Sequence, residues 1–250
     1  MKYGILSVMA VVFACIVYAQ DVNAIIADAE KSERDLKEAE ALNKYKEVLT
    51  IQPANVKALW KAAELTGRIG SRLKKEDQRI SHMQQAKQYA EAALKADHNS
   101  ADANYAIAAT AMRYAAITKG KERAGFLREM KYYADSALMI NPAHARALYV
   151  LGKWNFDIVT MGVGDKAAAK VLFGGMPRAS LEDAIIYFEK ARAADIFLMI
   201  DYLDLAKAYI KFHQTDKAID VLNKMAKLPP RTEDDPGYKA EGKTLLASLL

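Results

Sequence analysis

The sequence predicts an all-α chain that folds over residues 22–250 as a superhelix of helical hairpins, an α-solenoid. The chain has only 12 Gly and 6 Pro among 250 residues and is rich in Ala, Leu, Lys and Glu, a composition that favours helix. No alternating run of β-branched residues is long enough to indicate a strand. A pattern of small and large residues also recurs along the chain, which indicates a repeated structural unit.

The clearest copy of the repeat covers residues 202–230. Ala206 and Ala218 would let two antiparallel helices approach closely, while Tyr209 and Leu222 fill the space beside them. Pro230 cannot continue the second helix, so the chain turns into the next unit. This spacing is that of the tetratricopeptide repeat, carried by Tyr202, Leu205, Ala206, Tyr209, Ala218, Leu222, Met225 and Pro230.

Four upstream segments repeat the pattern of the second helix, with units that end at positions 53, 98, 142, 196 and finally 230. Their first helices are expected to begin near 56, 101, 145 and 199, with Gly152 at a close helix contact. The repeating residues are Ala41, Tyr45 and Val48; Ala86, Ala90 and Ala93; Met130, Ala134 and Ala137; and Ala184, Phe188 and Ala191.

The unit ends lie 45, 44, 54 and 34 residues apart, so three hairpins are longer than the standard repeat. In the second and third hairpins the extra residues have helical character and predict extended helices. In the fourth, "GVGDKAAAKVLFGGMPRAS" predicts a loop with a short helical middle. Residues Pro236 to Leu250 predict a capping helix, which a solenoid needs to cover its last apolar face.

Residues 1–19 have the features of an export signal. Lys2 is followed by an apolar stretch from Tyr3 to Val17, which is too short to span a bilayer comfortably, and Val17 and Ala19 offer small residues before a cleavage site. We therefore expect an exported, periplasmic protein cut after Ala19. A lipoprotein anchored at Cys15 remains the alternative.

Charge and cysteine content limit the possible functions. The loss of Lys2 with the signal segment takes the formal charge from +5 to +4, which does not by itself indicate nucleic-acid binding. Cys15 is the only cysteine, so the mature chain would have no disulfide and no thiolate metal site.

The C-terminal half resembles the regulator of microtubule dynamics family, whose members are tetratricopeptide-like. The resemblance is strongest from about residue 140 to 250 and continues more loosely back to about residue 25. It implies an all-helical interaction scaffold. The matching residues are Leu151, Gly152, Trp154 and Phe156; Leu172, Phe173, Gly174, Pro177 and Ala179; and Leu228, Pro229, Thr232, Glu233, Asp234 and Asp235.

No set of residues indicates catalysis, a metal site or a cofactor. The four histidines, His82, His98, His144 and His213, are scattered and are expected to be exposed polar residues. The acidic run from Glu233 to Asp235 is expected to favour a helix N-terminus, with a cation site as the alternative. Trp154 is expected to fill the core.

The strongest functional signal is the concave face, which the first helix of each hairpin should line. Trp60, Tyr105 and Tyr149 occupy equivalent positions in three consecutive units and would give flat apolar contacts. Arg113 and Lys153 should rim the same surface and orient an anionic group. With Met112, these residues form the predicted binding site. The alternative is that long helices close the groove and the aromatic residues are packed.

Two basic stretches are predicted to project from one edge. Residues 68–79 and 118–131 each contain five basic and two acidic residues, and both fall at the turn between the helices of a hairpin. A solvated edge is one interpretation, and contact with an anionic partner or a membrane surface is the other.

The sequence therefore predicts a non-enzymatic scaffold that binds a protein or peptide through its concave face in the cell envelope. The alternative is a protein that binds a lipid or small anionic ligand, possibly for transport. The shape of the groove distinguishes the two, since an open trough suits a peptide and a closed apolar tunnel suits a lipid.

Overall fold

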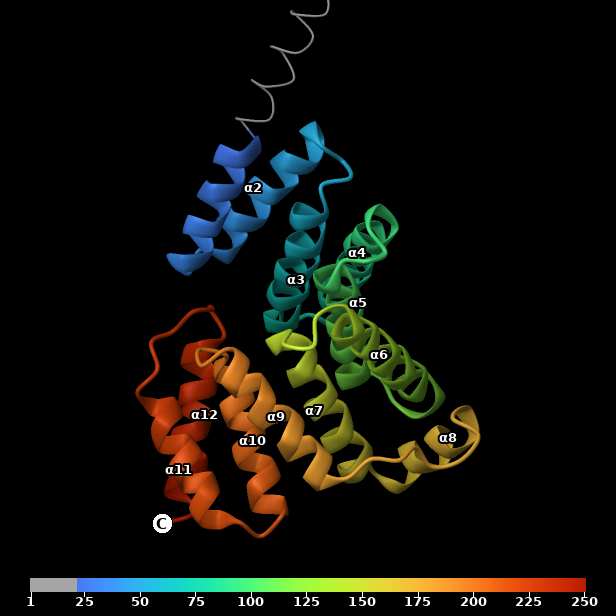
Figure 1. The fold of residues 1–250 in the computed structure, drawn as a ribbon, viewed down its shortest axis with the longest axis vertical. Coiled ribbons are helices and arrows are strands. Elements are labelled where there is room, and N and C mark those ends of the chain that lie inside the picture. The colour runs from blue at the N-terminus through green and yellow to red at the C-terminus, as the bar shows by residue number, and fades with distance from the viewer. Residues whose placement is uncertain (1–21) are drawn as a thin grey trace, which may run out of the picture.

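The computed structural model describes residues 22–250 and confirms the predicted succession of helical hairpins (Figure 1). The predicted signal segment and Cys15 lie outside this range. Within it every regular element is a helix. A helix over residues 22–34 is followed by α2 (Glu38–Ile51), α3 (Val56–Arg72), α4 (Glu76–Ala96), α5 (Ala101–Ile117), α6 (Gly120–Ile140), α7 (Ala145–Thr160), α8 (Val163–Leu172), α9 (Leu181–Ala194), α10 (Met199–Lys211), α11 (Thr215–Ala226) and α12 (Asp235–Ala247).

The hairpins are α3 with α4, α5 with α6, α7 with α9, and α10 with α11, preceded by residues 22–34 with α2. The helices α3 and α5 have 17 residues each and α4 and α6 have 21, against 13 and 12 in α10 and α11. This confirms the extended second and third hairpins. The capping helix is α12, which packs on α10 and α11.

Side-chain caps fix where three successive first helices begin. Asn55 accepts a hydrogen bond from the Ala58 backbone N–H at 3.0 Å, and Ser100 accepts one from Ala103 at 3.2 Å. His144 does the same with its Nδ1 atom, 3.1 Å from the Ala147 nitrogen. Each cap satisfies a backbone donor that the helix leaves free, so the chain enters each concave-face helix at the same register.

The insertion in the fourth hairpin contains α8, as the sequence predicts, and α8 packs beside α6 at one corner of the molecule (Figure 1). Asp165 holds it there, because its carboxylate accepts from the Gly120 backbone N–H at 2.8 Å and pairs with Arg123 at 2.6 Å. Arg123 therefore does not belong to a free basic edge.

Close helix contacts build the core. Trp154 is 1% exposed, which confirms its predicted place in the core. Gly152 lies where α7 crosses α9, and a Cβ atom built there would stand 2.5 Å from Cδ1 of Phe188, itself fully buried. The predicted contact at Gly152 is therefore confirmed. No helix within residues 22–250 is both long and apolar enough to cross a membrane.

Replacing Gly152 with Ala should destabilise the fold, because the added methyl group overlaps the Phe188 ring. Overpacking of this kind costs about 1–3 kcal/mol in the free energy of unfolding. Gly125→Ala in α6 is the matched control, since no atom lies within 4 Å of its added Cβ, and it should gain up to about 1 kcal/mol in helix propensity. Urea unfolding measures both, and an unchanged free energy for Gly152→Ala would contradict the packing.

Asp201 on α10 is a buried carboxylate that lowers the stability of the fold when it is ionised. Its side chain is fully buried, and neither carboxylate oxygen has a hydrogen-bond partner within the described chain. Burial raises the pKa of Asp201 well above its usual value, Asp204 raises it further, and Arg192 lowers it. Glu189 on the neighbouring α9 and Asp195, which directly follows that helix, also raise it. The folded protein therefore favours the neutral acid.

Asp201→Asn should consequently stabilise the protein more at pH 7 than at pH 4. Above about pH 4 the unfolded chain releases a proton that the folded chain retains, so the stability of the parent falls by up to about 1.4 kcal/mol per pH unit until the folded-state pKa is passed. The Asp201→Asn variant has no carboxylate at this position, so its stability does not fall with pH for this reason. Urea unfolding of both proteins between pH 4 and pH 7 tests it, and a difference that does not change with pH would show that Asp201 is not held neutral.

Candidate functional site

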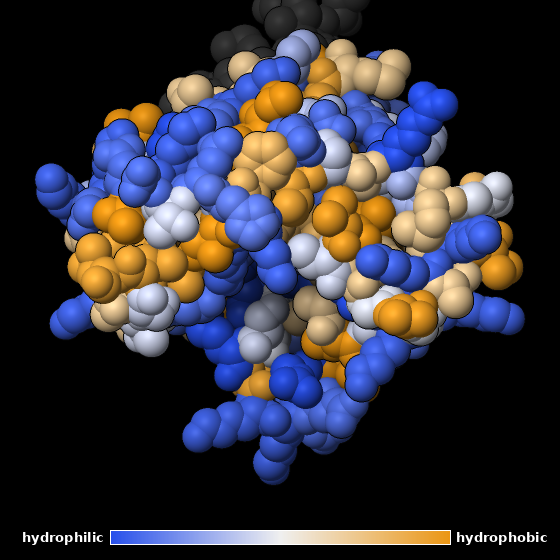
Figure 2. Space-filling view, turned by 90° about the horizontal axis from the view of Figure 1, so that it is seen from below, coloured by the Kyte–Doolittle hydropathy of each residue, from blue (hydrophilic) through white to orange (hydrophobic). Residues whose placement is uncertain are grey.

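The concave face holds a partly enclosed cavity of about 640 Å³. Helices α3, α5 and α7 line one side, and the segments that lead into α10 and α12 line the other. Apolar contributions come from Met112, Phe197 and Met199, and charged ones include Glu64 and Arg113. Seen from below, the surface of the molecule mixes hydrophilic and hydrophobic residues and is hollowed near the centre of the view (Figure 2). The cavity is neither an open trough nor a purely apolar tunnel.

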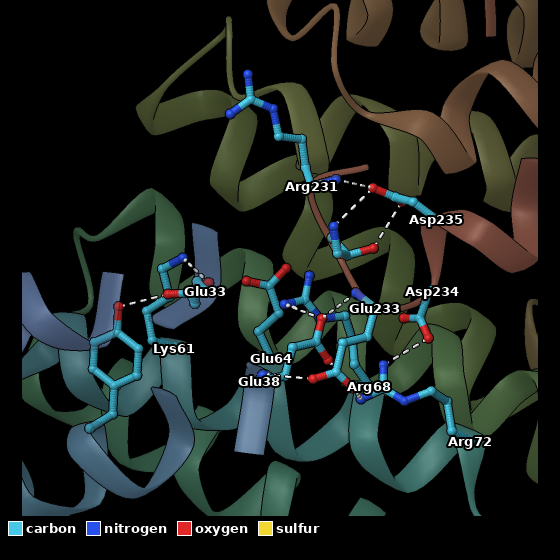
Figure 3. A network of polar contacts seen from close by, with 12 residues as sticks. Glu33, Glu38, Lys61, Glu64, Arg68, Arg72, Arg231, Glu233, Asp234 and Asp235 are labelled. Carbon is cyan, nitrogen blue, oxygen red and sulfur yellow. Dashed lines mark hydrogen bonds and ion pairs between the residues drawn. The ribbon is translucent and has the colours of Figure 1, made fainter. Parts of the chain in front are cut away.

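A contact that joins the N-terminal hairpin and α3 to the segment before α12 bridges one side of the cavity. We call its residues, Glu38, Arg68, Arg72, Glu233 and Asp234, the clasp (Figure 3). Glu38 is 1% exposed, pairs with Arg68 at 3.1 Å and accepts a hydrogen bond from Arg72 at 2.8 Å. Arg72 also pairs with Glu233 at 3.1 Å and with Asp234 at 2.8 Å. One guanidinium therefore joins three carboxylates from two distant parts of the chain.

Backbone hydrogen bonds strengthen the clasp. The Glu38 N–H donates to the Glu233 carboxylate at 2.7 Å, and the Glu233 N–H donates to the Glu38 carboxylate at 3.1 Å. The loop is shaped by Asp235, whose buried carboxylate accepts from the Arg231 N–H at 2.6 Å and from the Thr232 N–H at 2.9 Å. Such charge-assisted bonds hold the loop against the start of α2.

A buried ion pair lies in the cavity wall. Glu64, 4% exposed, accepts from Arg146 at 2.9 Å and from the Tyr105 hydroxyl at 3.1 Å. Burial raises the pKa of Glu64, but the charges of Arg146, Arg68 and other nearby cations outweigh it and hold that pKa well below its usual range. Glu64 in turn raises the pKa of Arg146, so the pair stays ionised and links α3, α5 and α7.

A second buried carboxylate joins α7 to α10. The Tyr149 hydroxyl donates to Asp204 at 2.9 Å, and Lys207 pairs with Asp204 at 3.3 Å and with Glu241 of α12 at 2.9 Å. Burial, followed by the charge of Asp204, raises the pKa of Tyr149 well above its usual value, so the phenol stays neutral and donates. These bonds fix the position of the cavity wall.

The structure brings four of the six predicted site residues together. Tyr105, Met112, Arg113 and Tyr149 line the cavity. Whether they bind a ligand stays a prediction.

The expectation of a flat row of aromatic rings on an open surface is wrong in its geometry. Trp60, Tyr105 and Tyr149 are only 9%, 5% and 6% exposed, and the two tyrosine hydroxyls bond to Glu64 of α3 and Asp204 of α10. Trp60 does not line the cavity and packs beside Arg146, whose guanidinium carbon lies 5.9 Å from the ring centre. Lys153 also lies outside the cavity, because it pairs with Asp157 one turn along α7.

Two other expectations are corrected. His144 is not an exposed polar residue, because it caps α7 and its Nε2 atom lies 3.1 Å from Asp102. Arg68 and Arg72 do not form a free basic edge, because both pair with Glu38, although Arg72 stays partly exposed. Within residues 22–250 no group of three or more His, Cys, Asp or Glu is placed to hold a metal ion.

Glu38 was not among the residues that the sequence singled out, and neither were Asp204 and Tyr238. Glu38 bonds to Glu233 across 195 positions, a separation at which sequence spacing carries no signal. The acidic run 233–235 was noticed, but its partner Arg72 was assigned to a basic edge.

Replacing Arg72 with Met should loosen the clasp, because Met keeps an apolar side chain of similar length but has no charge. With one cation gone, Glu38 is buried with Arg68 alone, and the contact to Glu233 and Asp234 loses its ion pairs. The Glu38 and Glu233 amide protons should then exchange with solvent faster. Hydrogen exchange resolved by mass spectrometry or NMR measures this.

Lys74→Met is the control for that experiment, because Lys74 is exposed and has no ion-pair partner within residues 22–250. Equal protection of both amides in the two variants would show that Arg72 does not hold the loop.

Comparisons with known proteins agree with this architecture. The family model "Regulator of microtubule dynamics protein 1-3" matches residues 25–250. The regulator of microtubule dynamics protein 1 of Mus musculus is 29% identical over 255 residues, covering 99% of this chain and 80% of that protein. The Pongo abelii protein of the same name is 28% identical over 213 residues, covering 83% of this chain and 65% of its own length.

Solved structures support the fold. A thermophilic TPR protein of Thermus thermophilus superposes with a TM-score of 0.64 at 13% identity, covering 89% of this chain and 99% of that one. The pilF protein of Pseudomonas aeruginosa gives a TM-score of 0.52 at 14% identity, covering 93% of each chain. These likenesses show a tetratricopeptide-like solenoid, which agrees with the helical hairpins described above. With the family model matched along almost the whole described chain, the protein belongs to the regulator of microtubule dynamics family.

Proposed function

We propose that the protein is a non-enzymatic binding scaffold that takes a segment of a protein or peptide partner into the cavity on its concave face. The observation that carries this proposal is the cavity itself, whose volume of about 640 Å³ falls in the range of specific ligand sites. Its wall combines apolar area from Met112, Phe197 and Met199 with the cation Arg113. A partner with an apolar side and an anionic group fits this lining.

The rigid wall supports the same proposal. The ion pair of Glu64 with Arg146 and the bond from Tyr149 to Asp204 hold the concave-face helices at fixed positions. A site whose walls are already ordered loses less conformational freedom on binding, which favours affinity.

The second candidate is a lipid or small anionic molecule that binds in the same place. The clasp favours it, because closure of the groove limits the occupant to a short segment or a small ligand. For either candidate we propose an exported, periplasmic location with cleavage after Ala19, or anchoring as a lipoprotein at Cys15 as the alternative. This part of the proposal rests on the N-terminal sequence alone.

Filling the cavity should abolish binding. Met112→Trp places a large ring in the cavity, whereas Met139→Trp adds the same ring at an exposed position of α6. The tagged parent and both variants would be recovered from native cells, and co-purifying proteins and small molecules identified by mass spectrometry. We expect a partner with the parent and with Met139→Trp, and about a tenfold loss or more with Met112→Trp.

The identity of the recovered molecule decides between the two candidates, since a peptide or protein supports the first and a lipid or small acid supports the second. Recovery of the same molecule in equal amount with Met112→Trp, in a variant that keeps its helicity, would show that the cavity is not the binding site.

A further inference from the structure

Arg113 is held in the cavity by backbone contacts. Its side chain crosses from α5 to α3 and lies on Gly67, where an added Cβ would stand 3.1 Å from Cδ, 3.2 Å from Nε and 3.3 Å from Cζ. Its Nη1 atom donates to the Ala109 carbonyl oxygen at 3.2 Å. A side chain at position 67 would press on Arg113 and shift it by a few tenths of an ångström, so Gly67 gives the guanidinium room to lie across α3.

Arg113 differs from the other arginines of α3, α5 and α7 that line the cavity. Arg68 and Arg72 pair with Glu38, and Arg146 pairs with Glu64. Among the described residues no carboxylate lies within the 4.0 Å of an ion pair with Arg113. The guanidinium of Arg113 donates one hydrogen bond to a carbonyl oxygen and has further N–H groups that can donate to an occupant of the cavity.

The carboxylates of the cavity cannot easily supply that partner. Glu64 is bonded to Arg146 and Tyr105, Asp234 to Arg72, and Asp235 to the backbone of the loop before α12. Asp195, which also lines the cavity, accepts from the Phe197 N–H at 2.9 Å. These carboxylates are committed to other contacts. Arg113 therefore remains, with Arg231 of the loop before α12, as a lining arginine that has no ion pair among the described residues.

Tyr238 of α12 offers a second free group. It lines the same cavity, and its hydroxyl has no hydrogen-bond partner within residues 22–250. Burial, then the charge of Asp234, raises the pKa of Tyr238 to about 12, against an opposing effect of Arg113. The hydroxyl is therefore neutral at physiological pH and can donate a hydrogen bond.

On the basis of the proposed function, we infer that the cavity holds the carboxylate of its ligand on the Arg113 guanidinium, with the Tyr238 hydroxyl as a further donor. A planar carboxylate matches the fork of an arginine, and a hydroxyl can satisfy a remaining lone pair. A doubly charged phosphate needs more donors than this pair provides and meets the nearby carboxylates of Glu64 and Asp234. Met112 and Phe197 receive the apolar remainder of the ligand.

The carboxylate has two possible sources, the C-terminus of a peptide and a small organic acid, and the probes separate them. They are N-acetyl-trialanine as the free acid, the same peptide as the C-terminal amide, hexanoate, and inorganic phosphate. Binding to the full chain is followed in ¹⁵N NMR spectra through the backbone amides of residues that line the cavity, in the parent and in every variant. The Nε–Hε resonance of Arg113 is followed as well in the proteins that keep this residue. The acid should bind about tenfold more tightly than the amide.

Variants locate the effect. Arg113→Gln should remove the preference for the acid, and Tyr238→Phe should reduce it a few-fold. Arg128→Gln is the control, since Arg128 is exposed on α6 outside the cavity and should leave the preference unchanged. Because Gln keeps a polar side chain over Gly67, thermal unfolding is expected to confirm that Arg113→Gln stays folded.

Hexanoate that binds as well as the peptide acid assigns the site to small acids, and a clear preference for the peptide assigns it to peptide C-termini. Equal binding of acid and amide, tighter binding of phosphate than of either acid, an unchanged preference in Arg113→Gln, or no saturable binding of either acid at millimolar concentration would each overturn the carboxylate site. None of these outcomes tests the proposed function itself, which is tested separately by comparing the partner recovered with the parent and with Met112→Trp.

Discussion

The buried carboxylate of Glu38 is the interaction on which the closed form of the molecule depends. A tetratricopeptide-like solenoid contacts itself only between neighbouring repeats, so its two ends do not normally meet. Here Glu38 at the start of α2 bonds to Arg72 of α3 and exchanges backbone hydrogen bonds with Glu233, just before α12. A charge buried to this degree would be costly without partners, so the fold requires them to stay in place.

The contact between the two ends of the solenoid limits the size of the ligand that the concave face can hold. An open solenoid offers a long groove for an extended chain, whereas this one offers a cavity of limited volume with a mixed lining. The same arginine-rich region serves two purposes. Arg68, Arg72 and Arg146 neutralise buried carboxylates of the fold, while Arg113 lies against Gly67 and has no carboxylate of its own among the described residues. Three of these arginines thus stabilise the fold, while the fourth, Arg113, can bind a ligand.

Much of the fold could be predicted from the sequence because it rests on local patterns. Repeats of Ala, Tyr and Leu mark helix contacts, Pro142 and Pro230 end hairpins, and Gly152 marks a crossing, all within about 30 residues of one another. Four of the six predicted site residues line the cavity for the same reason, since the inward positions of the first helices follow from their register.

The remainder depends on contacts that sequence spacing does not report. Glu38 and Glu233 are 195 positions apart, and Tyr149 and Asp204 are 55 apart. Arg72 looked like part of a basic edge because its neighbours are basic, yet its partners come from both ends of the chain. Lys153 lies outside the cavity because Asp157, one helical turn away, pairs with it.

The central claim, that the two ends of the solenoid are joined and close the cavity, is tested most directly by one distance distribution. Spin labels at Ala39→Cys and Gly237→Cys, in a Cys15→Ser background, would flank the clasp at positions exposed to solvent. Pulsed electron paramagnetic resonance on the otherwise unaltered protein should give a single narrow distribution that matches the closed structure. A broad distribution extending to much longer distances would show that the ends part in solution and that the concave face is an open groove.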